Sequence, residues 1–468
     1  MASSSTGGGP EVDVLIAGGG NAAMCAAIMA RHGGASVLVL EAAPKAFRGG
    51  NSRHTRNLRY MHEGEDGFLT GTYPEDEFYE DLLRVTGGDT NEELARYCIR
   101  QSQDAGEWMS AHGIKWQPSL RGTLQLSRTN AFFLGGGKAL MNAYYNTAEK
   151  MGIRAEYDTE VRELNIEDGV FRSAVVEHKG QTREVAAKAF IGASGGFEAN
   201  VPWLKEYWGD AADNFIIRGT PYNKGVVLRQ LFDAGAKPAG RAKGFHAIAL
   251  DGRAPKFDGG IVTRLDCVPF GVVLNKNAER FYDEGEDFWP KRYAIWGTLI
   301  AGQPEQEAYC FVDAKSIDLF LPSVFPPFQA DSVRQLAAAL DLNPAKAEET
   351  VNAFNASVKP GTFDATILDD CSTEGMDPPK SHWARPIDTP PFYGYPLRPG
   401  ITFTYMGVAV NKQCQVLFGE DTPSPNIFAA GEMMSGNILG KGYLAGFGMT
   451  IGTVFGRIAG REAARAIA

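Results

Sequence analysis

The sequence lacks the marks of several classes of protein. Its 468 residues include six scattered cysteines and no Cys-x-x-Cys pair, which argues against a disulfide scaffold or a metal site and favours reduced thiols in the cytoplasm. No apolar run reaches the ~18 residues of a membrane-spanning helix. Residues 1–10 are small and polar without an apolar core, so we expect a disordered tail and not a signal peptide.

The chain also has too little positive charge for a nucleic-acid-binding protein. It has 46 Lys and Arg against 56 Asp and Glu, a formal net charge of −10. Such an excess of acid disfavours contact with nucleic-acid phosphates and favours solubility. The apolar fraction of 44% and the charged fraction of 22% are typical of a globular protein, and the length allows two or three domains.

A strand, a glycine turn and a helix open the chain. Five of the six residues of Val12–Ala17 are apolar, and Gly18, Gly19 and Gly20 follow. An alanine-rich stretch then predicts a helix over Ala22–Ala30. A second apolar strand, Ser36–Leu40, ends in Glu41. This order indicates a dinucleotide-binding turn, in which Gly18 makes the bend, Gly20 lets a pyrophosphate approach the backbone and Glu41 binds a ribose hydroxyl.

The remainder of the chain predicts one domain built from both chain ends and a second domain inserted in it. Short alternating strands occupy 153–190, a second glycine turn lies at 193–196, and a strand at 427–432 precedes a helix over 445–467. Between 236 and 390, proline, glycine and aromatic residues become frequent. We therefore predict an α/β protein with a Rossmann-like domain (11–235 and 391–468), made of a parallel sheet plus a β-meander, and an inserted α+β capping domain (236–390).

Together with these features, the segments 49–52, 193–196, 430–432 and 455–460 resemble the flavoprotein family of fumarate reductases and succinate dehydrogenases. Within that family, the segments 50–57, 279–293 and 440–443 are most similar to FAD-dependent tricarballylate dehydrogenases. The resemblance implies FAD as the cofactor. It also implies that the FAD is not covalently bound, because members with covalent flavin carry a histidine nearer Asn51 and Ser52 than His54 is.

The resemblance implies an FAD site made largely of glycines and loop residues. In it, Ser52 lies near the reactive ring nitrogen, Val161 meets the adenine through its backbone, and Glu432 bonds the ribityl chain. The complete predicted set is Gly18, Gly20, Asn21, Ala22, Glu41, Ala42, Arg48, Gly49, Gly50, Asn51, Ser52, Val161, Ala193, Gly195, Gly431, Glu432, Gly446, Phe447 and Gly448.

For the catalytic groups, the resemblance implies a changed set of charges. His246 falls where the family has a substrate-binding histidine, whereas Tyr443 stands near the place of a carboxylate-clamping arginine. The proton-donating arginine of fumarate reductases falls near Tyr293, so Arg292 and Tyr293 are both candidates. Arg53 adjoins residues 49–52, which we call the flavin loop. We predict that Tyr443 and Arg292 meet over the substrate face of the flavin.

Four further residues have both a functional and a structural interpretation. Arg56 and Arg121 could each bind a carboxylate through two hydrogen bonds, or could pair with a surface acid. His54 and Lys441 lie beside the loops assigned to the flavin and to Tyr443. No metal site is predicted.

These predictions lead to one main hypothesis and two alternatives. The main hypothesis is an FAD-dependent enzyme that dehydrogenates, or in reverse reduces, a C–C bond next to a carboxylate or carbonyl, as tricarballylate dehydrogenases do. The first alternative is a ketone-activating enzyme of the steroid Δ-dehydrogenase type, in which Tyr443 polarises the ketone. The second is a flavoprotein subunit that passes electrons between partners. The main hypothesis also predicts a separate electron-transfer protein as a partner of the enzyme.

Overall fold

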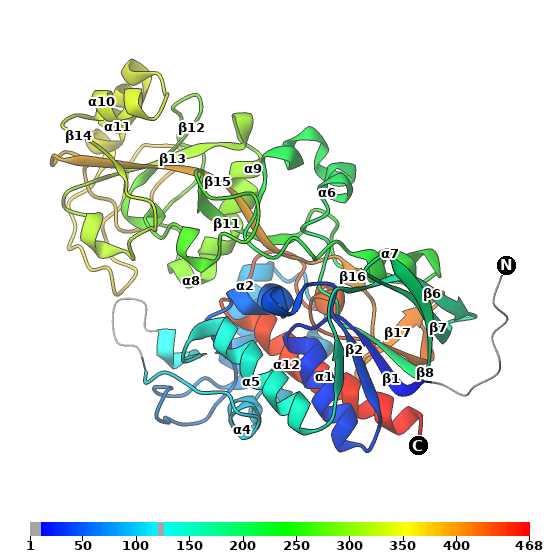
Figure 1. Ribbon diagram of the computed structural model, residues 1–468. Coiled ribbons are helices and arrows are strands. Elements are labelled where there is room, and N and C mark those ends of the chain that lie inside the picture. The colour runs from blue at the N-terminus through cyan, green and yellow to red at the C-terminus, as the bar shows by residue number, and fades with distance from the viewer. Residues whose placement is uncertain (1–10, 120–125) are drawn as a thin grey trace.

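A computed structural model describes residues 11–119 and 126–468 of the chain. The predicted tail (1–10) and Arg121 lie outside the described residues. The molecule has two parts, each built around its own sheet (Figure 1). The blue and red segments from the two chain ends lie in the larger part, and the yellow-green segments, together with the orange strand β15 (Phe392–Thr404), form most of the smaller one.

The larger sheet has a parallel centre. Its order is β17-β18-β8-β1-β2-β5. From β18 to β5 each neighbour runs parallel to the next. Because both faces are covered by other elements, the central strands are almost wholly apolar and buried. The strands are β1 (Val12–Ala17), β2 (Val37–Leu40), β5 (Arg154–Glu156), β8 (Gln181–Gly192) and β18 (Thr422–Ala429).

An antiparallel meander extends from this sheet. Strand β6 (Thr159–Glu167) pairs with β7 (Val170–His178), which pairs with β8, and the edge strand β17 (Gln415–Phe418) runs antiparallel to β18. Turns at Asp168-Gly169 and Lys179-Gly180 join the meander strands, each with both residues at positive φ. The predicted α/β fold, with a parallel sheet plus a β-meander, is confirmed.

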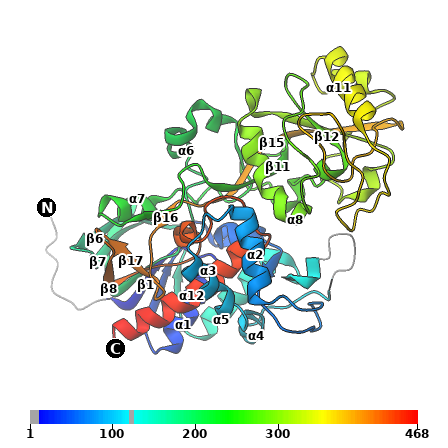
Figure 2. The same ribbon diagram turned by 180° about the vertical axis from the view of Figure 1, so that it is seen from behind.

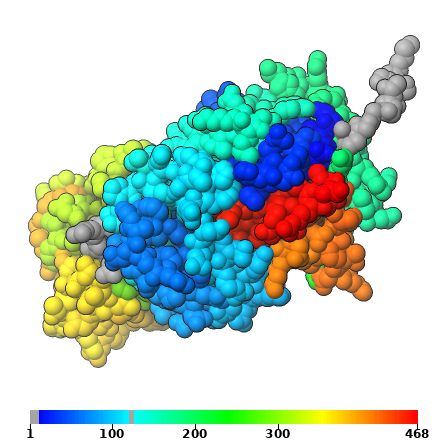
Figure 3. Space-filling model, turned by 90° about the horizontal axis from the view of Figure 1, so that it is seen from below, coloured from blue at the N-terminus to red at the C-terminus, as the bar shows by residue number. Residues whose placement is uncertain are grey.

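Two helices from opposite chain ends pack side by side against the sheet. They are α1 (Asn21–His32) and α12 (Phe447–Ala466), and both views and the space-filling face show the blue and red segments next to each other (Figures 1, 2 and 3). Gly456 and Gly460 of α12 make the close approach possible. A Cβ at Gly456 would lie 2.5 Å from Ala22 O, and one at Gly460 would lie 2.1 Å from Ala26 O.

The smaller part is a mixed sheet with short helices around it. Its order is β11-β15-β13-β12, with β14 and β9 also paired to β15. The strands are β9 (Ile216–Ile217), β11 (Phe245–Asp251), β12 (Val272–Asn275), β13 (Ala308–Asp313), β14 (Phe328–Ala330) and β15 (Phe392–Thr404). The helices are α8 (Trp289–Arg292), α9 (Trp296–Ala301), α10 (Val333–Ala339) and α11 (Pro344–Ser357).

The smaller sheet reaches beyond the predicted insertion of 236–390. Strands β9 and β15 belong to it, although both lie in ranges assigned to the other domain. Residues 378–399 are rich in proline, and β15 accommodates two of these prolines. Pro396 pairs only with Tyr309 of β13, and Pro399 pairs only with Ala249 of β11. Each proline thus has a neighbouring strand on one side only, so the sheet does not require the N–H that proline lacks.

The remaining elements cover and connect the two sheets. Helices α2 (Glu75–Thr86), α3 (Glu92–Gln101), α4 (Ala105–Ala111) and α5 (Gly136–Lys150) belong to the larger part, with the short strands β3 (Asn57–Arg59) and β4 (Asn130–Phe132). The segments between the sheets include α6 (Val201–Trp208), α7 (Val226–Asp233), β10 (Pro238–Ala239) and β16 (Gly407–Val408). Among the described residues, no helix is both long and apolar enough to cross a membrane.

Candidate active site

One long cavity runs from the carboxyl ends of the parallel strands to the smaller sheet. It encloses about 1510 Å³ of space not filled by atoms, part of it open to solvent. Ala17, Leu40, Ala193 and Ala430, which end or follow β1, β2, β8 and β18, line it at one end. Ligands of open parallel sheets bind outside these strand ends. The far end is lined by side chains that include His246, Tyr293 and Tyr443.

The β1–α1 turn has the shape that a pyrophosphate requires. Gly18 has a φ of +106°, and a Cβ there would lie 2.3 Å from Ala193 O. Gly20 lines the cavity, and a Cβ on it would point toward Ser52 Oγ at 3.4 Å. Helix α1 begins at Asn21 without a side-chain cap. The N–H of Asn21 donates to Ser52 Oγ at 3.0 Å. The other N–H groups at the start of the helix are therefore available to an anion.

Glu41 is buried where β2 ends and lines the cavity. Its carboxylate accepts hydrogen bonds from the backbone N–H of Ala43 and of Gly49, both at 3.0 Å. Burial raises the pKa of Glu41, and these backbone bonds act against the rise. The N–H bonds hold the carboxylate at the cavity wall, where hydroxyl groups of a ribose can donate to it.

Asn51 joins the flavin loop to both sheets. Its side-chain amide donates to Glu198 Oε1 and to Thr402 O, both at 2.6 Å, and its Oδ1 accepts from Thr220 N at 2.8 Å. Asn51 therefore has every polar atom engaged, which fixes the loop that follows Gly50. Asn223 also donates to Glu198 Oε1, at 2.7 Å.

Two buried carboxyl groups, Glu198 and Glu432, lie together behind this loop. Glu432 lines the cavity and accepts from Thr404 N at 2.7 Å. Burial raises the pKa of Glu198 to about 7. Burial and the charge of Glu198 hold the pKa of Glu432 well above its ordinary value. The pair therefore retains a proton near neutral pH, because two adjacent buried carboxylates cannot both ionise cheaply.

The N-terminus of α12 faces the same cavity. Ala445, Gly446 and Gly448 line it, and Gly446, the N-cap residue, has a φ of +83°. A Cβ at Gly446 would lie 2.6 Å from both Asn57 Oδ1 and Asn130 Nδ2. Two helix N-termini thus border one cavity, which suits a ligand with electron-rich groups at both places.

Most of the residues assigned to FAD from the sequence line the cavity, and three do not. Arg48 donates to Asn142 Oδ1 at 2.9 Å and lies over the ring of Tyr145. Gly49 gives its N–H to Glu41, and Phe447 is fully buried against Phe78. The sixteen that line the cavity are Gly18, Gly20, Asn21, Ala22, Glu41, Ala42, Gly50, Asn51, Ser52, Val161, Ala193, Gly195, Gly431, Glu432, Gly446 and Gly448.

At the far end, three side chains form a compact group of rings. His246 Nε2 lies 3.0 Å from Tyr293 Oη, and the ring centroids of His246 and Tyr443 are 4.3 Å apart. Tyr443 Oη accepts the N–H of Gly448 at 2.8 Å. Burial, followed by the charges of Arg218 and Arg264, holds the pKa of His246 well below its ordinary value, so its imidazole is neutral.

Arg56, Arg218 and Arg264 bring positive charge to this group. Burial lowers the pKa of both Arg56 and Arg218 to about 10. Arg264 pairs with Asp266 at 2.7 Å, and this acid raises its pKa against the effect of burial. Arg218 Nε donates to Thr402 Oγ1 at 2.8 Å, but its buried Nη1 has no hydrogen-bond partner among the described residues.

The other predicted catalytic residues lie elsewhere. Arg292 does not line the cavity and pairs with Glu286 at 2.7 Å, so the predicted meeting of Arg292 with Tyr443 is not found. Arg53 also lies outside the lining, with its guanidinium over the ring of Phe47. Lys441 lies beside Gly87 at the end of α2.

The two remaining candidates, which follow the flavin loop in sequence, line the cavity. They are Arg56, already described, and His54, whose Nε2 lies 2.6 Å from Asp258 Oδ1. Burial lowers the pKa of His54 to about 4, although Asp258 opposes this shift.

Sequence reasoning missed Arg218 and Arg264. Arg218 directly follows the apolar pair Ile216–Ile217, so a charged residue at the end of a buried strand was the available signal. Arg264 lies in an irregular segment after a short 3-10 turn, and no periodic pattern marks it. The two arginines are 46 positions apart. They come together because Arg218 follows β9, which pairs with β15, and Arg264 bridges Leu250 of β11, which also pairs with β15.

The glycine turn, the buried Glu41 and the two helix N-termini around one elongated cavity define a dinucleotide-binding protein of the Rossmann-like type. The chain belongs to the family described as FAD binding domain, which it matches over residues 13–448. FAD is therefore its cofactor. The cavity geometry fits this group, since the close glycine approaches leave room for a ligand along the strand ends.

The chain is also similar to known reductases and dehydrogenases. It is 26% identical over 476 residues to an NADH:fumarate oxidoreductase from Klebsiella pneumoniae (strain 342), across 97% of this chain and 48% of that protein. The chain thus spans about half the length of this relative.

Two solved structures share the fold. One is the open conformation of a flavocytochrome c3 fumarate reductase, with a TM-score of 0.74 and 23% identity over 98% of this chain and 79% of that one. The other is a 3-ketosteroid-Δ4-(5α)-dehydrogenase from Rhodococcus jostii RHA1 in complex with 4-androstene-3,17-dione. It has a TM-score of 0.74 and 22% identity, over 98% of each chain.

Proposed function

We propose that this chain interconverts a single and a double C–C bond next to a carboxylate, and that its substrate is a polycarboxylic acid of the tricarballylate type. The observation that carries the proposal is the buried Nη1 of Arg218, which has no hydrogen-bond partner among the described residues. An unpaired buried guanidinium is costly, and a substrate carboxylate would satisfy it.

The charges around Arg218 favour an anion over a neutral ligand. Arg56 also lines the cavity. Asp266 pairs with Arg264, and His246 is neutral. The group therefore carries net positive charge. Several guanidinium groups in one place suit a substrate with more than one carboxylate, because each planar fork can hold two oxygens.

The reaction divides between the cofactor and the chain. When bound, FAD supplies the acceptor or donor of the hydride. The chain supplies a proton-transfer group, and Tyr293 has the best position for it because its hydroxyl lies among the arginines and 3.0 Å from His246 Nε2. Burial raises the pKa of Tyr293, while Arg264, Arg218 and Arg56 oppose that rise.

In this proposal, the Tyr293 hydroxyl exchanges a proton with the carbon next to the carboxylate, and His246 Nε2 holds the hydroxyl in place. The arginines stabilise the negative charge that develops on the carboxylate side of the substrate. Closure of the smaller part over the cavity would exclude water from this charge. A separate electron-transfer protein and a cytoplasmic location stay predictions.

One observation supports a second candidate function. Tyr443 Oη accepts the N–H of Gly448, which leaves its own proton free for a ligand oxygen. A tyrosine in this state can polarise a ketone. The chain shares its fold with a 3-ketosteroid-Δ4-(5α)-dehydrogenase. We therefore keep a ketone substrate as the alternative.

Anaerobic mixing of the FAD-loaded protein with single compounds tests these proposals. Tricarballylate should bleach the oxidised-flavin absorbance, whereas 4-androstene-3,17-dione and its saturated analogue should not change the oxidised or reduced spectrum. A response to the steroids alone would replace the main proposal with the ketone alternative. No response to any small molecule would favour the electron-transfer subunit.

Two arginine variants make this test specific to the cavity. Arg218→Met should raise the tricarballylate concentration for half-maximal bleaching by roughly 10- to 100-fold, since a hydrogen bond to a charged group contributes about 1.5–3 kcal/mol. Arg253→Met is the matched control, because Arg253 pairs with Asp251 in the same sheet region and does not line the cavity. Equal responses of the two variants would remove Arg218 from the site.

A further inference from the structure

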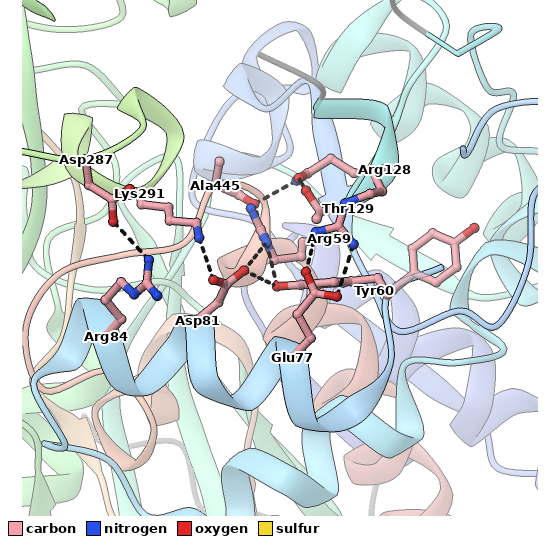
Figure 4. Close-up of polar contacts among 12 residues, drawn as sticks. Arg59, Tyr60, Glu77, Asp81, Arg84, Arg128, Thr129, Asp287, Lys291 and Ala445 are labelled. Carbon is pink, nitrogen blue, oxygen red and sulfur yellow. Dashed lines mark hydrogen bonds and ion pairs between the residues drawn. The ribbon is translucent and has the colours of Figure 1, made fainter. Parts of the chain in front are cut away.

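Two ion pairs connect helix α2 of the larger part with the segment around α8 of the smaller part. Lys291 Nζ lies 2.6 Å from Asp81 Oδ1, and Arg84 Nη1 lies 3.4 Å from Asp287 Oδ2. The two helices are neighbours in both ribbon views (Figures 1 and 2). Figure 4 shows the carboxylate of Asp81 between Lys291 on one side and Arg59 on the other.

The second oxygen of Asp81 leads to the flavin end of the cavity. Tyr73 Oη donates to Asp81 Oδ2 at 3.0 Å, and Arg59 Nη1 lies 3.8 Å from the same oxygen. Arg59 is almost fully buried, and its Nε donates to Ala445 O at 3.0 Å. Ala445 immediately precedes Gly446, the N-cap of α12.

The first oxygen of Asp81 leads to the reactive end. Lys291 lies two residues before Tyr293, whose hydroxyl contacts His246. Trp289, at the start of the same short helix, donates through Nε1 to Asp266 Oδ1 at 2.6 Å. The segment 289–293 is therefore held at three points, and Asp81 provides the one that belongs to the larger part of the molecule.

We propose that Asp81 is a positioning residue that places two walls of the cavity relative to each other. Through Lys291 it holds Tyr293 over the cavity, and through Arg59 it holds the Ala445–Gly446 backbone at the flavin edge. The catalytic side of this inference rests on the proposed function, in which Tyr293 transfers the proton. The structural side, that the Asp81 carboxylate fixes both walls, does not rest on the proposed function.

The charge and burial of Asp81 explain why this residue suits the task. Its side chain is only 10% exposed and faces two cations, Lys291 and Arg59. Removing the carboxylate charge would leave these cations near each other without a counter-charge, a strongly unfavourable arrangement for partly buried groups. The segments that carry them would then separate.

Glu77 offers a matched control one turn earlier on α2. Its carboxylate pairs with Arg128, a residue of the larger part, so this ion pair does not reach the smaller part (Figure 4). Glu77→Gln thus removes an ion pair from the same helix without touching the proposed connection.

Hydrogen–deuterium exchange of the FAD-loaded protein tests the structural side. Lys291→Met should raise the exchange rate of peptides over 289–295 at least about tenfold and leave those over 441–448 unchanged. Asp81→Asn should raise both, and Glu77→Gln should raise neither. Wild-type exchange of 289–295 in Lys291→Met, or effects equal to those of Glu77→Gln, would overturn the proposal.

Single-turnover flavin reduction by tricarballylate tests the catalytic side. Lys291→Met should lower the rate constant at least about tenfold, with less than a threefold change in the half-saturating concentration, because Lys291 does not line the cavity. A larger change in half-saturation than in rate would overturn the positioning role. If tricarballylate fails to reduce even the wild-type protein, the proposed function fails, while the exchange experiment still decides whether Asp81 holds both walls.

Discussion

The two ends of the cavity are lined by different kinds of groups. At the strand ends the walls are mostly backbone, with Gly18, Gly20 and Gly446 at the closest approaches. At the far end the walls are long side chains, among them Arg218, Tyr293 and others from the smaller sheet region. One end thus recognises a ligand by shape and N–H groups, and the other by charge and proton exchange. Substitutions at the first should change cofactor affinity, and those at the second should change substrate binding or reaction rates.

The largest expected effect is on the rate and belongs to Tyr293. Tyr293→Phe keeps the ring and removes the hydroxyl that contacts His246. The rate of flavin reduction by substrate should fall by roughly 10²–10⁴ with FAD still bound, the usual contribution of a general acid or base. Stopped-flow absorbance measures this rate.

Tyr443→Phe is the companion variant. Its hydroxyl accepts the N–H of Gly448, and burial together with Tyr293 raises its pKa, so it keeps its proton and is a weak acid. We expect this variant to weaken substrate binding more than it slows the reaction. The opposite ranking of the two tyrosines would exchange their roles and would favour the ketone alternative.

The next effect is on FAD affinity and belongs to Gly18. A Cβ there meets backbone atoms of Ala193 and Ser194 at 2.3–2.7 Å, and φ is +106°. Gly18→Ala should therefore weaken FAD binding by roughly 2–4 kcal/mol through overpacking and backbone strain. Fluorescence titration of the FAD-free protein measures the loss.

Gly34→Ala controls for strain alone. Gly34 has a φ of +88° but nothing within 4 Å of a Cβ. We expect a small loss of stability and unchanged FAD affinity. Equal losses of FAD in both variants would show that backbone conformation, and not the contact with Ala193, shapes the cofactor end.

A third effect concerns pH and the buried acids between the two ends. Because burial raises the pKa of Glu198 from its ordinary value of 4.5 to about 7, the folded protein holds an extra proton between these values. The contribution of Glu198 to stability should therefore be complete below about pH 4.5, fall by about 3 kcal/mol as pH rises to 7, and stay level above it. Glu198→Gln should flatten this slope in urea unfolding of the FAD-loaded protein. An unchanged slope would place the extra proton elsewhere.

The smallest expected effect belongs to Arg292. This side chain pairs with Glu286 and does not line the cavity. Arg292→Lys should therefore change the rate of flavin reduction less than about threefold, because Lys keeps the charge of this partly exposed ion pair outside the cavity. A severe loss would restore the interpretation from sequence, in which Arg292 acts on the substrate.

The same contrast explains what the sequence could reveal. Gly18 and Glu41 belong to a local pattern of strand, turn and helix, so their neighbours in space are near in sequence. The parallel sheet and its meander could be predicted for that reason. Arg218 and Arg264 depend on long-range strand pairing with β15, which no local pattern encodes. Arg292 and Tyr293 adjoin in sequence, yet only Tyr293 faces the cavity, because the chain turns between two short helical segments there.

The arginines at the far end also set how an anion arrives and leaves. The protein as a whole has a formal charge of −10, so a distant anion is repelled, whereas Arg56 and Arg218 attract it once it is inside. Salt screens charges separated by more than about 8–10 Å and affects buried contacts much less. Raising the ionic strength from a low value should therefore speed the entry of a carboxylate more than it speeds its release. The entry and release rates of a neutral ketone would not depend on ionic strength. The salt dependence of the entry rate therefore distinguishes a carboxylate from a ketone.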